Sequence, residues 1–403
     1  MSNTGVTGRW LHPEGWTMYY LFLLGFFAIF STTISKNPVL PLFSQALGAN
    51  DTIIGLIAAF SPFAGILFSF PVGVLSDHLG RKRLLIMSGI VFLTAPLLYL
   101  LITNPLWLIP VRFFHGTATA ILGPVISAVI AERFPASKGQ MLGQYSSATL
   151  IGRSIAPLIG GAIISYFIFY PGLFPYRIVY VAAALAAVPV FMMTLMFPDD
   201  SASVHVLPFS IFRESFVTFF SNRRLRGTAV VDMATYFAFG AFETFLPVFL
   251  FSQGIGAFQT GIIFAIQVLI IAASKPLFGM IADRVDKRIQ IAAGLIIIGS
   301  SVAVIPFTSS FSLVLVVSAI FGMGMSLSTV ATTAYVADVA GKEQIGASMG
   351  ALSSIMDIGQ SMGPLITGII ITAAGFSSGF FVSFLLAVVI TVVFVVSVTD
   401  PAQ

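Results

Sequence analysis

The sequence predicts an all-α membrane protein whose twelve transmembrane helices form two pseudo-symmetric six-helix bundles. Of the 403 residues, 57% are hydrophobic and only 8% are charged, whereas soluble domains carry roughly 25% charged residues. Apolar segments of about 20 residues, long enough to cross a bilayer as a helix, recur along the whole chain. The second half also restates the first, since Gly73 and Asp77 return 206 residues later as Gly279 and Asp283.

The predicted spans fall into two groups of six, separated by a polar stretch. They cover approximately residues 17–43, 51–75, 84–103, 106–131, 140–168 and 175–197, and then 228–251, 258–281, 289–308, 311–336, 344–373 and 376–398. Each should be a helix, because lipid offers no hydrogen-bond partner to a loose backbone group. We therefore expect an N-terminal bundle over 1–197, a cytosolic loop over 198–227 and a C-terminal bundle over 228–403.

The positive charges indicate how the chain is oriented. Most of the 19 Lys and Arg residues lie between alternate spans, for example Arg81, Arg133 and Arg223. Short loops rich in Lys and Arg stay on the cytoplasmic side of a membrane. We therefore expect a multi-pass protein with both termini in the cytosol, in a prokaryotic cytoplasmic membrane.

Several classes of protein are excluded by what the chain lacks. It has no cysteine, and its four histidines have no ligand spacing, so neither a disulfide nor a metal site is predicted. No nucleotide-binding or hydrolase motif is present, which argues against an enzyme, a cofactor and an ATP-driven pump. The basic residues lie in short loops rather than in one patch, so we expect no nucleic-acid partner.

The repeat predicts the same ion pair twice. Arg81 and Glu132 are 51 residues apart, and so are Lys287 and Asp338. A spacing that both copies keep suggests that each loop cation contacts the acid ending the fourth span of its half. The alternative is solvated cytosolic charge. The candidate gating residues are Gly73, Asp77, Gly80, Arg81, Glu132, Asp283, Lys287 and Asp338.

Small residues mark one face of the fifth span. Gly152, Ala156 and Gly160 are spaced by four, and such a smooth helix face lets another backbone approach closely. The alternatives are ordinary helix packing and a direct role in binding the substrate, and we expect the packed face to slide or seal between the two halves. The complete set of candidate packing residues is Gly143, Gly152, Ala156, Pro157, Gly160 and Gly161.

Polar and charged residues inside the spans are the candidates for binding and proton coupling. A charge at the bilayer centre costs on the order of 3 kcal/mol, so each should be paired or face water. The candidates are Lys36, Asn37, Arg112, His115, Arg153, Asp232, Tyr236, Glu243, Asp357 and Gln360. Glu243 is the repeat equivalent of Asn37, so we expect the halves to place Lys36 and an acid at similar depth. Static ion pairing is the alternative, and Lys275 can snorkel to the cytosolic interface.

These motifs resemble the major facilitator superfamily over essentially the whole chain. The signature G-x-L-x-D-x-x-G-R-K is matched at Gly73, Leu75, Asp77, Gly80, Arg81 and Lys82, although Asp286 replaces the second glycine in the repeat copy. Two further elements are similar to those of the drug/proton antiporter branch. They are Arg112 with Gly116 in span 4, and the series Gly143, Gly152, Ala156, Pro157, Gly160 and Gly161, in which Ala156 replaces a glycine.

The resemblance implies a major facilitator fold and secondary active transport of a small organic solute by alternating access. It favours proton-coupled export, with protons, the solute and the lipid bilayer as partners, and a monomeric protein. Proton- or ion-coupled symport and facilitated uniport of an anionic or zwitterionic solute remain the alternatives. A channel is a further alternative, but it would not explain two similar halves.

Overall fold

The computed structural model describes residues 14–198, 219–308, 310–340 and 345–399, with side chains described outside 14–16, 70–71, 73–79, 345–347 and 397–399. In these residues, 11 helical segments are long and apolar enough to cross a membrane. The last of them, α13, contains two spans, which meet at Gly375 with a φ of 82°. The predicted all-α fold with twelve spans is confirmed.

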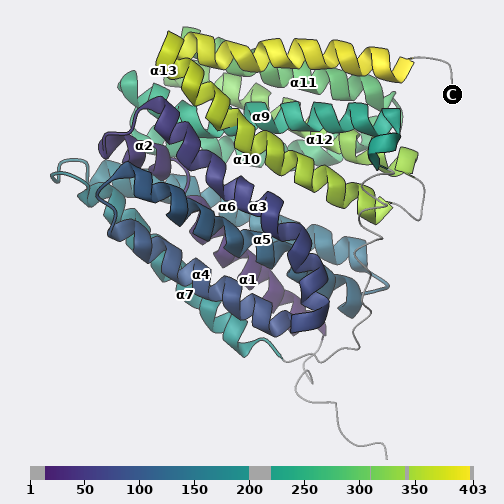
Figure 1. The fold of residues 1–403 in the computed structure, drawn as a ribbon, viewed down its shortest axis with the longest axis horizontal. Coiled ribbons are helices and arrows are strands. Elements are labelled where there is room, and N and C mark those ends of the chain that lie inside the picture. Colours follow the sequence, from purple (N-terminus) through teal and green to yellow (C-terminus); the bar gives the residue numbers. More distant parts are fainter. Residues whose placement is uncertain (1–13, 199–218, 309, 341–344, 400–403) are drawn as a thin grey trace, which may run out of the picture.

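The N-terminal half consists of helices that lie together in the lower part of Figure 1. They are α1 (Glu14–Ile34), α2 (Val39–Ala46), α3 (Asp51–Leu79), α4 (Arg81–Leu100), α5 (Leu108–Arg133), α6 (Lys138–Tyr166) and α7 (Phe174–Met196). The predicted first span is therefore two helices, α1 and α2. Pro38 explains the break, because proline has no N–H to donate and disfavours a helical residue before it.

The C-terminal half forms the upper part of Figure 1. Its helices are α9 (Arg223–Ser252), α10 (Ala257–Ala282), α11 (Lys287–Val304), α12 (Phe311–Ala340) and α13 (Ile345–Thr399). The predicted loop over 198–227 ends too late, since the Asn222 side chain accepts hydrogen bonds from Arg224 N and Leu225 N and caps α9 there. Residues 199–218 of that loop lie outside the described part of the chain.

The two halves meet along α3 and α13 on one side and along α6 and α10 on the other. We call the end with the α3–α4 and α10–α11 junctions the basic end, because Arg81 and Lys287 begin the helices there. The opposite end holds α2 and is called the α2 end (Figure 1). There the apolar cores join across the halves: Ala257 packs in an N-terminal cluster, and Ile54 packs in a C-terminal one.

Candidate functional site

An ion pair joins the two halves inside the bundle. Lys36 Nζ lies 2.6 Å from Glu243 Oε2, and Asn37 Nδ2 donates to Glu243 Oε1 over 2.9 Å. Lys36 and Asn37 lie in the break between α1 and α2, and Glu243 lies on α9. Both carboxylate oxygens therefore have partners from the other half, and the expected meeting of Lys36 with Glu243 is present.

Three further charged candidates form no ion pair with a described residue. Arg153 on α6 is exposed, whereas Asp232 on α9 is buried. Asp357 on α13 packs on α3, where a Cβ built on Gly65 would lie 2.6 Å from its Oδ2. Tyr236 lies one turn from Asp232 on α9. Gln360 lies one turn beyond Asp357 on α13 and is half-buried.

Arg112 and His115 lie inside the N-terminal half, on α5. Arg112 is 2% exposed and His115 is 1% exposed. The Tyr99 hydroxyl lies 3.5 Å from His115 Nδ1, and its ring stacks on Tyr180 with a centroid distance of 4.4 Å. Among the residues that the structure describes, neither Arg112 Nε nor His115 Nε2 has a hydrogen-bond partner. Arg112 and His115 are therefore buried within one half, and their predicted binding role stays a prediction.

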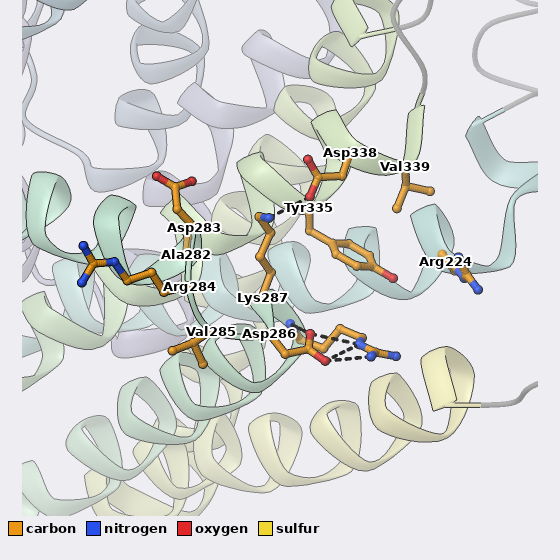
Figure 2. A pocket seen from close by; sticks show the side chains of 11 residues that line it. Arg224, Ala282, Asp283, Arg284, Val285, Asp286, Lys287, Tyr335, Asp338 and Val339 are labelled. Atoms are coloured by element: carbon orange, nitrogen blue, oxygen red, sulfur yellow. Dashed lines mark hydrogen bonds and ion pairs between the residues drawn. The ribbon is translucent and has the colours of Figure 1, made fainter.

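The two predicted loop ion pairs are both present. Arg81 pairs with Glu132 in the N-terminal half. Lys287 Nζ lies 2.8 Å from Asp338 Oδ2 in the C-terminal half, as Figure 2 shows. Each pair connects two helices of the same half, so neither one by itself holds the halves together. The side chain of Asp77, together with Gly73, lies outside the described side chains, and the gating role stays a prediction.

We expect Glu132→Ala to destabilise the protein more than Asp338→Ala. The Arg81 side chain is only 10% exposed, whereas that of Lys287 is 22% exposed. Loss of a charge-assisted partner from a mostly buried guanidinium costs about 1–3 kcal/mol, and loss of a surface pair costs about 0–1 kcal/mol. Thermal unfolding of both variants in the same detergent checks this; equal losses would contradict it.

The repeat departs from the signature at Asp286 for a structural reason. Gly80 has a φ of 81°, a conformation that favours glycine, whereas Asp286 has a φ of −54°. The Asp286 carboxylate accepts from Arg288 N over 2.9 Å and pairs with the Arg288 side chain. In Figure 2, dashed lines mark the interactions of Asp286, and Asp283 is directed away from Lys287. The carboxylate thus caps α11 and replaces the glycine turn.

Asp286→Ala should remove about 1 kcal/mol of stability, the usual worth of a helix N-cap, and Asp286→Asn should retain most of it. The hydrogen bond from the Arg288 side chain lowers the pKa of Asp286. The contribution of this pair is therefore complete above the unfolded pKa of about 3.9 and is lost as the pH falls through the lower folded value. Melting temperatures at neutral and acidic pH test both statements, and equal losses in the two variants would rule out the cap.

The small-residue face of α6 packs within its own half, which corrects the expectation of a face between the halves. A Cβ on Gly152 would lie 2.8 Å from the Phe26 carbonyl oxygen of α1, and one on Gly160 would meet Ile34. Ala156 is buried beside them. In the repeat, Gly359 meets the Met233 carbonyl of α9 in the same way. Spacing by four identifies such a face but not the helix that covers it.

The neighbouring residues Pro157 and Gly161 make the contact between the halves. A Cβ on Gly161 would lie 2.3 Å from the Ala257 carbonyl oxygen, and one on Gly261 would lie 2.3 Å from that of Pro157. Phe258 N donates to Ser165 Oγ over 3.0 Å. We call this set of contacts between α6 and α10 the first latch.

The second latch repeats these contacts between α3 and α13. A Cβ on Gly368 would lie 2.4 Å from the Asp51 carbonyl oxygen, and one on Gly55 would lie 2.2 Å from that of Pro364. Thr52 N donates to Thr372 Oγ1 over 3.0 Å. Every residue stands 206 or 207 positions from its equivalent in the first latch. The sequence prediction missed Gly55, Gly261 and Gly368 as partners, although the repeat offset relates them.

The described glycines near the basic end differ from those of the two latches. A Cβ added at Gly143 on α6, Gly279 on α10 or Gly350 on α13 would meet no atom of the described residues within 4 Å. Gly143, expected as a packing residue, is exposed. These three glycines therefore make none of the close backbone contacts that the latches make.

Comparison with known proteins places this geometry in context. The Major Facilitator Superfamily model matches residues 21–291 and 228–403. An uncharacterized MFS-type transporter of Methanocaldococcus jannaschii is 25% identical, with 88% of this chain and 92% of the relative covered. The staphylopine export protein of Staphylococcus aureus is 23% identical, with 94% and 95% covered. The crystal structure of the nucleoside transporter NupG superposes with a TM-score of 0.75 at 13% identity, covering 95% of this chain and 99% of that one.

Proposed function

Because the chain belongs to the major facilitator superfamily and is a multi-pass membrane transporter of small solutes, we propose that it exports a small organic solute in exchange for protons. The similarity to the staphylopine export protein supports the direction. The concentration of Lys and Arg at the basic end supports a cytosolic location for that end and for both termini. In this proposal the latched α2 end faces the outside, and residues 1–197 and 228–403 move against each other in an alternating-access cycle.

The observation that carries the proposal is the Lys36–Glu243 ion pair between the halves. A nearby cation stabilises an ionised carboxylate, and separating the two removes that stabilisation. When the α2 end opens, Lys36 and Asn37 move away from Glu243, and the carboxylate can take a proton from outside. When that end closes, the pair re-forms and the proton leaves through the open basic end. Proton affinity then depends on which side is open, as exchange requires.

Asp357 is the second candidate for the proton site. Its carboxylate lies where α13 packs on Gly65 of α3, and no described cation pairs with it. A carboxylate in such a place changes its surroundings whenever α3 and α13 move apart. Both acids thus lie at contacts that the alternating-access cycle would break and re-form.

The test is a proteoliposome assay with an imposed pH gradient and a panel of small organic solutes. A proton-coupled exporter accumulates its solute in vesicles with an acidic lumen, and the lumen becomes more alkaline as it does so. Accumulation in vesicles with an alkaline lumen would instead indicate symport. Uptake that equilibrates without regard to the gradient would indicate uniport, and either result would reject the proposal.

A further inference from the structure

The C-terminal half has a charged pocket at the basic end, which Figure 2 shows from close by. Its volume is about 460 Å³, within the range of about 300–1,000 Å³ that is usual for small-molecule sites. The residues that line it come from three spans, and they include Arg224 on α9, Lys287 on α11 and Tyr335 on α12. The ion pair of Lys287 with Asp338 forms part of its wall.

The same place in the N-terminal half is filled by apolar side chains. At the repeat offset of 206 residues, Arg224 corresponds to Met18 and Tyr335 corresponds to Val129. Met18 is 7% exposed and Val129 is 1% exposed, and both belong to one apolar core cluster. The fold therefore does not require a polar pocket at this position. Arg224 and Tyr335 are features of the C-terminal half alone.

One cation of the pocket has no counterion among the described residues. Four cations and three carboxylates line the pocket, so its net charge is +1. Lys287 pairs with Asp338 over 2.8 Å, and Arg288 pairs with Asp286 over 2.7 Å. Neither pair includes Arg224, which is exposed and forms no ion pair with a described residue.

The unpaired cation lies on the same side of the pocket as a tyrosine. In Figure 2 the ring of Tyr335 lies between Lys287 and Arg224, whereas the neighbours Asp283 and Arg284 lie on the opposite side. A guanidinium and a phenolic hydroxyl both donate hydrogen bonds, and the planar fork of an arginine matches the oxygens of a phosphate. This side of the pocket therefore offers a positive charge and a hydroxyl donor to an anion with one negative charge.

The location of the pocket favours a phospholipid over a soluble anion. Helix α9 begins at Arg223, α11 begins at Lys287 and α12 ends at Ala340, so the pocket lies at the level of the lipid headgroups. Val285 lines the pocket and is 44% exposed, and Ile289, about one turn further along α11, is 63% exposed. An apolar surface for lipid chains thus continues from the pocket along a membrane-spanning helix. Basic pockets between spans bind anionic headgroups.

We propose that this pocket binds the phosphate of an anionic phospholipid between Arg224 and Tyr335. The acyl chains then lie along Val285 and Ile289. The two ion pairs of the pocket involve residues of α11 and α12 but none of α9. The phosphate contacts Arg224 of α9 and Tyr335 of α12, so the bound lipid adds a link between these helices and stabilises the C-terminal half. This site is separate from solute–proton exchange and does not depend on it.

The test measures the melting temperature of the purified full chain in one neutral detergent with added probes. The probes are phosphatidylglycerol, phosphatidylcholine with the same acyl chains, and inorganic phosphate. Phosphatidylcholine carries the same phosphodiester but a choline cation cancels its charge, and inorganic phosphate lacks the chains. We expect phosphatidylglycerol to raise the melting temperature at the lowest concentration. The other two should need at least about tenfold more, since one charge-assisted contact is worth about that factor.

Variants of the two proposed contacts locate the effect in the pocket. Arg224→Met introduces the residue of the N-terminal half and should raise the half-saturating concentration of phosphatidylglycerol about tenfold. Tyr335→Phe removes only the hydroxyl and should raise it about threefold. Arg224→Lys keeps the charge and should keep most of the response, which separates loss of charge from misfolding. Arg226→Gln removes an exposed cation of the same turn that does not line the pocket, and it should change nothing.

Four results would overturn the proposal. They are equal stabilisation by phosphatidylcholine and phosphatidylglycerol, an undiminished response in both Arg224→Met and Tyr335→Phe, an equal loss in Arg226→Gln, and no stabilisation by any probe. Saturation by inorganic phosphate at the concentration of phosphatidylglycerol would assign the pocket to a soluble anion and would also overturn it. The assay contains no solute and no proton gradient, so its failure leaves the proposed exchange function standing.

Discussion

Glu243→Gln should abolish accumulation of the solute against its gradient while leaving downhill exchange of the same solute. The amide keeps the size of the carboxylate, and its single oxygen can still accept a hydrogen bond from either Asn37 or Lys36, which lie 2.9 Å and 2.6 Å from the Glu243 oxygens. The glutamine amide cannot take up and release a proton near neutral pH. For one proton exchanged, a gradient of one pH unit supports about a tenfold accumulation, and this ratio should fall to about one. Solute flux into proteoliposomes with an acidic lumen measures this accumulation ratio.

The matched controls address the ion pair and the fold separately. Glu243→Asp keeps a titratable group and should retain part of the accumulation. Lys36→Gln removes the cation, so the carboxylate should hold its proton in both states, and exchange should slow at acidic pH. If Glu243→Gln still drives uphill flux with an unchanged pH dependence, the proton site lies elsewhere. Asp357→Asn in the same assay would then decide whether the second candidate carries the proton.

Much of the fold was predictable because the same residue separations recur in both halves of the repeat. The Arg81–Glu132 and Lys287–Asp338 pairs follow from a separation of 51 residues kept in both copies. The meeting of Lys36 with Glu243 follows from the equivalence of Glu243 and Asn37 and from the cost of an unpaired charge in lipid. These predictions use only the register along the chain, which the sequence contains.

What could not be predicted is the direction in which a helix face points. Gly160 and Gly161 are neighbours about 100° apart on α6, yet the first meets Ile34 of its own half and the second meets Ala257 of the other. Spacing alone cannot distinguish these two arrangements. The cap at Asp286 was missed for a related reason. In the sequence this residue only replaces the glycine of the signature, and its hydrogen bond from Arg288 N is known only from the structure.

Gly261→Ala should open the α2 end and stop transport. The added Cβ would lie 2.3 Å from the Pro157 carbonyl oxygen, and a backbone atom cannot move aside as a side chain can. Overpacking of this kind costs about 1–3 kcal/mol, which is on the order of a tenfold to hundredfold shift in population. The distance between spin labels at Gln45→Cys and Gln253→Cys, two exposed residues at the ends of α2 and α9, reports the change.

Because the latch is duplicated, the same opening of the α2 end can be tested at the second latch. Gly55→Ala meets the Pro364 carbonyl at 2.2 Å in the second latch and should open the same end to a similar extent. Gly123→Ala, where a Cβ meets nothing within 4 Å, should leave both the distance and transport unchanged.

Hydrogen bonds at the α2 end also join the two latches. Phe258 N and Thr52 N lie in the first turns of α10 and α3, and each donates to a hydroxyl of the opposite half, Ser165 or Thr372. Each half therefore completes a helix end of the other, and opening the α2 end must expose both N–H groups together. If Gly261→Ala opens that end and Gly55→Ala does not, the two latches do not act as one closure.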